Sequence, residues 1–82
     1  MKRKLYFERS NRHLLPLGEV TDLSAAYALI NEFIEKHNYK SYYTRMWTEE
    51  SGVTYFDVGS HSEFFIMYPE GEEPFNREID EV

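Results

Sequence analysis

The sequence predicts an α+β domain in two layers, with a single helix packed on one face of a mainly antiparallel four-stranded sheet. One segment has helical periodicity, and four short segments are rich in β-branched and aromatic residues. The linkers between the last three of these segments are short enough for hairpins. We therefore expect the order β-α-β-β-β, a folded domain over residues 1–69 and an acidic tail over residues 70–82.

The first expected strand is Arg3–Glu8. Alternation along a strand places Leu5 and Phe7 on one face and Tyr6 on the other. A right-handed crossover through the helix would set this strand parallel to a later one.

Residues 9–20 are expected to form a long connection, because Asn11, Pro16 and Gly18 are residues that favour turns and loops. The apolar residues of this segment are expected to fold back onto the core; they are Leu14, Leu15, Leu17 and Val20.

A helix is predicted from about Asp22 to His37. Thr21 or Asp22 can accept hydrogen bonds from the free N–H groups of the first turn. Asn38 is suited to a left-handed stop after the last turn. One stripe recurs at helical spacing, made of Leu23, Ala26, Tyr27, Ile30, Phe33, Ile34 and His37.

Three further strands are expected over residues 40–49, 52–59 and 62–69. Their composition is rich in β-branched and aromatic residues, as strands require. Residues 50–51 and 60–61 are the expected hairpin turns.

Aromatic residues lie on both faces of the expected sheet, although one helix covers only one of them. The uncovered aromatics predict a contact surface for a partner or a second copy. The alternative is that residues 9–20 and the acidic tail fold over this face. The residues expected to bind a partner are the aromatic and cationic Tyr43, Arg45, Trp47 and Tyr55 and the acidic Glu49, Glu50, Glu70, Glu72 and Glu73.

Charge is distributed unevenly along the chain. Acidic residues outnumber basic ones by 15 to 9, for a formal net charge of −6 and a pI near 4.9. Residues 1–13 are basic, and the rest of the chain is acidic. A global acidic field repels phosphates, so direct nucleic-acid binding is not expected. With no apolar segment long enough to span a bilayer, we expect a cytoplasmic protein that does not enter membranes.

A second candidate site surrounds the turn near residue 60. There, Asp57, Ser60, His61 and Glu63 could form a small polar pocket for a ligand. The alternative is ordinary turn chemistry, with the serines bonding to local backbone groups. The chain has no cysteine, no nucleophile elbow and no phosphate-cradling loop, so no catalytic residue, metal ligand or cofactor is predicted.

Residues 5–10 (Leu-Tyr-Phe-Glu-Arg-Ser), residues 57–65 (Asp-Val-Gly-Ser-His-Ser-Glu-Phe-Phe) and the acidic tail resemble small uncharacterised proteins carried by phages and prophages of Firmicutes. This resemblance implies a class of protein rather than an activity. Such proteins often bind and block a host or defence protein, and some are acidic mimics of nucleic acid. If this chain is such a phage protein, we expect it in the cytoplasm of the host cell.

We therefore expect a non-enzymatic, acidic protein-binding module, an inhibitor or modulator of a host or defence protein with a basic surface. The alternative is an oligomeric protein that binds a small, nucleotide-like ligand at the pocket formed by Asp57, Ser60, His61 and Glu63. A small enzyme acting through three of these residues is the least favoured hypothesis.

Overall fold

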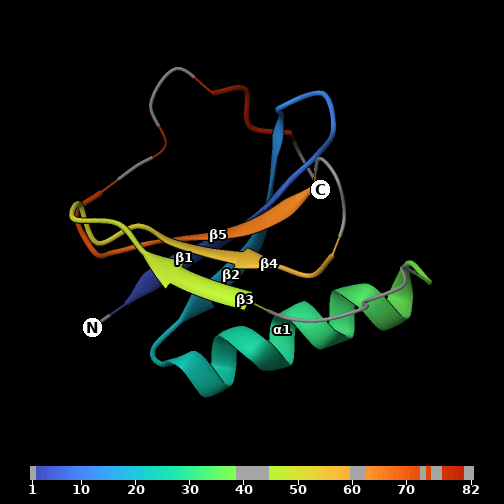
Figure 1. Cartoon of the computed structure of the whole chain (residues 1–82), viewed down its shortest axis with the longest axis horizontal. Helices are drawn as coiled ribbons and strands as arrows, with labels where there is room; N and C mark the ends of the chain where they lie inside the picture. The colour runs from blue at the N-terminus through green and yellow to red at the C-terminus, as the bar shows by residue number, and fades with distance from the viewer. Residues whose placement is uncertain (1, 39–44, 60–62, 73, 75–76, 81–82) are drawn as a thin grey trace.

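The computed structural model describes residues 2–38, 45–59, 63–72, 74 and 77–80. Its helix and strands follow one another as β1 (Arg3–Glu8), β2 (Leu14–Val20), α1 (Leu23–Lys36), β3 (Arg45–Thr48), β4 (Thr54–Asp57) and β5 (Phe64–Tyr68). The predicted α+β class is confirmed: α1 lies along one side of an antiparallel sheet (Figure 1).

The five strands lie in the order β2-β1-β5-β4-β3, and each neighbouring pair is antiparallel. The two edge strands, β2 and β3, therefore run in the same direction. The chain crosses from one edge of the sheet to the other through α1.

The sheet has one strand more than the sequence predicted, so both the four-stranded sheet and the β-α-β-β-β order are wrong. Part of residues 9–20, expected to be a connection, forms β2. Pro16 and Gly18 are tolerated there because β2 is an edge strand, and the β1–β2 register shifts between Leu5 and Tyr6.

The helix was expected to set the first strand parallel to a later one; β1 does run in the same direction as β4, but the strand that follows the helix, β3, runs opposite to it. β1 is paired antiparallel with both β2 and β5. The reason is that β2 reverses the chain before the crossover, so the crossover relates β2 rather than β1 to a parallel strand.

The helix is confirmed, together with both of its ends. The Asp22 carboxylate accepts a hydrogen bond from the Ala25 N–H at 2.8 Å, which caps the first turn. Asn38 has a φ of 55°, the left-handed conformation that ends many helices.

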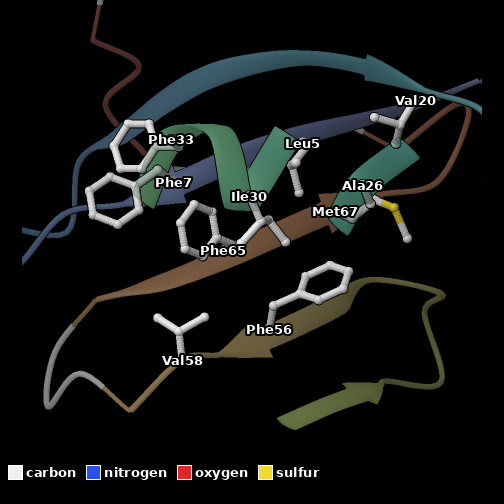
Figure 2. Close-up of a cluster of buried hydrophobic side chains, with 10 residues drawn as sticks. All are labelled: Leu5, Phe7, Val20, Ala26, Ile30, Phe33, Phe56, Val58, Phe65 and Met67. Atoms are coloured by element: carbon white, nitrogen blue, oxygen red, sulfur yellow. The ribbon is translucent and has the colours of Figure 1, made fainter. Parts of the chain in front are cut away.

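The larger core cluster lies between α1 and the sheet (Figure 2). Ala26, Ile30 and Phe33 of α1 are buried against the strands. Phe7, Phe33 and Phe65 form a group of rings with centroids 4.6–5.6 Å apart. The strand residues of this cluster are Leu5, Phe7, Val20, Phe56, Phe65 and Met67, with Val58 just beyond β4.

A second buried cluster lies on the face of the sheet away from α1. It contains Tyr6, Leu14, Val53 and Ile66. The C-terminal segment pairs with this region: the Leu14 N–H donates to the Glu78 carbonyl at 2.8 Å, and the Asp80 N–H donates to the Leu14 carbonyl at 2.7 Å. Part of the segment predicted as an acidic tail is thus hydrogen-bonded to β2.

Ion pairs hold the same segment to the β1–β2 hairpin. Arg77 pairs with the buried carboxylate of Glu8 and donates to the Arg12 carbonyl at 3.2 Å. Asp80 lies 3.1 Å from the His13 ring and 3.4 Å from the Arg9 guanidinium. Among the residues that the structure describes, no helix could cross a membrane.

Candidate functional site

The face of the sheet away from α1 becomes more exposed from β1 toward β3. The strand registers place Tyr6, Ile66, Tyr55 and Trp47 in one row across four strands. Tyr6 is 6% and Ile66 1% exposed, Tyr55 is half-buried, and Trp47 is 37% exposed. The β1–β2 half of this face therefore belongs to the core, whereas the β3–β4 half is open.

Aromatic rings and one cation cover the open half. Trp47 stacks on Tyr55 with centroids 5.5 Å apart and an interplanar angle of 16°. Phe64 meets Trp47 edge-on at 6.4 Å, and the Arg45 guanidinium lies 5.7 Å from the Trp47 ring centroid. We call Arg45, Trp47, Tyr55 and Phe64 the aromatic surface.

A buried carboxylate fixes the cation of this surface. Asp57 accepts a hydrogen bond from Arg45 at 3.0 Å, with 8% of the Asp57 side chain and 67% of the Arg45 side chain exposed. The other Asp57 oxygen accepts from the Gly59 N–H at 2.9 Å. The carboxylate thus holds the guanidinium over the Trp47 ring and stabilises the turn after β4.

Contacts on the helix side hold β3 itself in place. The Tyr27 hydroxyl lies 3.9 Å from the Met46 sulfur, and the Thr48 and Thr54 hydroxyls are 3.0 Å apart. Because these contacts tie a short edge strand to α1 and β4, the aromatic surface is preorganised.

Four of the predicted acidic residues gather at one end of the sheet. Glu49 and Glu50 begin the β3–β4 turn, and Glu70 and Glu72 follow β5. The two turns touch, since a Cβ on Gly52 would lie 3.2 Å from Cγ of Pro69. All four residues are exposed, and Glu49 directly follows the β3 strand that carries Trp47.

The basic N-terminal residues lie near the same end. Lys2 and Lys4 share a shallow cavity of about 190 Å³ with Glu19, Glu70 and Glu72. The Lys2 ammonium is 4.0 Å from the Glu19 carboxylate, an exposed pair of small energetic value. Glu49 and Glu50 do not line this cavity; they directly follow β3.

Tyr68 joins the covered and open halves of the face. Its ring meets Tyr6 edge-on at 5.6 Å. Burial, with smaller contributions from Tyr55 and Tyr6, raises the pKa of Tyr68 above its ordinary value of 10.0. The phenol is therefore neutral at physiological pH and acts as a packing group with a polar tip.

The structure brings together three of the residues expected to bind a partner, Arg45, Trp47 and Tyr55, and adds Phe64. Strand alternation could have identified Phe64, because it shares a face with Ile66 and Tyr68. Tyr43 and Glu73 lie outside the described residues.

The alternative ligand site is divided between the two faces. Asp57 belongs to the open face, whereas Glu63 lines a cavity of about 350 Å³ on the helix side with Arg9, Phe33 and His37. Ser60 and His61 lie outside the described residues. Asp57 and Glu63 therefore do not share a site in the described part of the chain.

Within the described ranges, no three histidine, aspartate or glutamate side chains are grouped so that they could hold a metal ion. Comparisons with protein-family models, with curated proteins and with solved structures give no match. The case for a function therefore rests on the surfaces of this molecule.

Proposed function

We propose that this chain is a non-enzymatic protein-binding module and that its aromatic surface contacts a partner with a basic surface. One observation carries the proposal: Arg45 and Trp47, stacked with the half-buried Tyr55, are exposed on the open half of the sheet, where nothing in the described chain covers them. Tryptophan, tyrosine and arginine are the residue types that dominate binding energy at protein interfaces.

Preorganisation supports this assignment. Asp57 holds Arg45 over the Trp47 ring, and β3 is tied to α1 and β4. Little side-chain entropy is therefore lost when a partner covers these residues, so more of the contact energy appears as affinity.

Charge supports a basic partner. Glu49 and Glu50 lie beside the aromatic surface, and the chain carries a net charge of −6. Complementary charge accelerates encounter and weakens with salt. The resemblance to phage and prophage proteins gives the class of partner that we propose, a host or defence protein, with this chain as its inhibitor or modulator.

Capture from a bacterial lysate tests the proposal. Immobilised wild-type protein is expected to retain basic proteins at low salt that Trp47→Ala loses. Leu23→Ala is the matched control, because Leu23 is 40% exposed but lies on α1, on the other side of the sheet. Equal recovery by wild type and Trp47→Ala, with unchanged circular dichroism, would contradict the proposal.

One cavity favours the second candidate function, small-ligand binding. The cavity beside Glu63 is also lined by Arg9, Ser10 and His37, and its volume of about 350 Å³ suits a small molecule. A thermal-shift series with nucleotides tests it. A rise in Tm that His37→Ala removes would support this function, and no shift with any nucleotide would reject it.

A further inference from the structure

Within the described part of the chain, the outer edge of β3 presents backbone groups that do not bond to another strand of the sheet. The Glu49 N–H donates to the Val53 carbonyl at 2.9 Å, so the backbone N–H and C=O of Glu49 point toward β4. These groups alternate along an antiparallel strand, so those of Trp47 also face β4. The N–H and C=O groups of Met46 and Thr48 consequently point away from the sheet.

Although β3 is short, its described residues lack the proline, bulge and outward charge that often prevent an edge strand from pairing. Residues 45–48 contain no proline, their register with β4 is continuous, and all four are exposed. The charge of Arg45 is drawn over the face of the sheet by Asp57 instead of projecting from the edge. Long or flat edges without such devices pair readily with another strand.

We propose that β3 pairs antiparallel with β3 of a second copy, so that two sheets join into one across a two-fold axis at Trp47. In a continuous sheet, the side chains of facing residues point to the same side. The two-fold axis must therefore pass midway between a residue and the same residue of the second copy. An axis at Trp47 sets Met46 of each copy opposite Thr48 of the other copy. The outward N–H and C=O groups of these two residues then bond to each other.

Charge complementarity favours a second copy in this register. Arg45 and Glu49 lie on the same face of the strand as Trp47. In the register centred on Trp47, Arg45 faces Glu49 of the second copy, and this pair occurs twice. The two Trp47 rings lie next to each other, and cross-strand aromatic and opposite-charge pairs stabilise sheets.

The dimer is expected to be weak and to form at high protein concentration. One short strand pair buries much less than the roughly 1,200 Å² of stable interfaces, and each copy carries a net charge of −6. The inference goes beyond the proposed function and does not rest on it. It concerns the backbone edge, and it would set two aromatic surfaces side by side.

Sedimentation equilibrium of the full chain over a concentration series tests the dimer. Wild type is expected to pass from monomer to dimer, and Thr48→Pro is expected to stay monomeric because proline lacks the outward N–H. Thr48→Val keeps that N–H and controls for loss of the hydroxyl contact to Thr54. Wild type that stays monomeric throughout would overturn the proposal.

A charge reversal tests the β3–β3 register independently and leaves the strand backbone unchanged. Glu49→Lys places two cations opposite each other at each end of the interface, so Kd is expected to rise at least about tenfold. Glu50→Lys changes the net charge equally but lies one residue further into the turn. Equal Kd values for these two variants, or dimers of a folded Thr48→Pro variant, would reject this arrangement.

Discussion

β2 and β3 are the two edges of one sheet and run in the same direction, yet they end the sheet in opposite ways. β2 contains a proline, has an irregular register with β1 and is hydrogen-bonded at its first residue, Leu14, to Glu78 and Asp80. β3 is regular, and all four of its residues are exposed.

The difference separates what stabilises the fold from what is left for binding. On the β2 side, Leu14 is fully buried, and Glu8 pairs with Arg77. On the β3 side, Trp47 and Arg45 are exposed but held in place. Substitutions on the β2 side should therefore lower stability, whereas substitutions on the β3 side should mainly lower binding.

Leu14→Ala should lower the free energy of unfolding by about 2–5 kcal/mol, the usual cost of a cavity at a fully buried leucine. Trp47→Ala should cost much less, because Trp47 is 37% exposed. Urea unfolding followed by circular dichroism compares the two variants. Equal losses of stability would contradict the division between the two sides.

Arg77→Ala should lower the free energy of unfolding by about 1.5–3 kcal/mol, the usual contribution of a hydrogen bond to a charged group, because it leaves the buried Glu8 carboxylate without its guanidinium. Arg9→Ala is the matched control: its 3.4 Å pair with Asp80 is more exposed and should be worth under about 1 kcal/mol. Urea midpoints measure both, and a smaller loss for Arg77→Ala than for Arg9→Ala would oppose the role of the C-terminal segment.

Asp57→Asn should lower the free energy of unfolding by about 1 kcal/mol, because it weakens a charge-assisted hydrogen bond to a mostly exposed arginine. Its larger effect should be on binding, since Arg45 is then held less firmly over the Trp47 ring. Capture of partners at low salt measures that effect. Binding retained in full would mean that the position of Arg45 is unimportant.

Tyr68 gives the smallest expected effect, a loss of stability at alkaline pH. Its pKa is raised in the folded state, so the stabilisation is complete below pH 10.0 and is lost as pH rises through the folded pKa. Wild type should therefore lose stability above pH 10.0 more steeply than Tyr68→Phe. Parallel curves of Tm against pH would show that this phenol does not contribute.

Features set by local chemistry were predictable from the sequence. The Asp22 cap, the left-handed Asn38 and the Arg3–Glu8 strand follow from neighbouring residues. Period-two alternation likewise placed Arg45 and Trp47 on one face.

Features set by distant contacts were not predictable. Pro16 and Gly18 look like loop residues until β1 pairs with the segment that contains them. Glu8 and Arg77 meet although 69 positions separate them, and no local pattern indicates that pair. Asp57 was a candidate residue of the alternative ligand site, and its hydrogen bond from Arg45 of the neighbouring strand was not foreseen.

The central claim is that the aromatic surface is where a partner binds, and the emission of Trp47 tests it directly. Trp47 is the single tryptophan of the chain, so its emission reports on this surface alone. The chain is titrated, at a concentration where it is monomeric, with a tryptophan-free peptide that spans the contact region of a captured partner. A shift of Trp47 emission to shorter wavelength, with protection from acrylamide, is the predicted result. Unchanged emission while the peptide binds would contradict the claim.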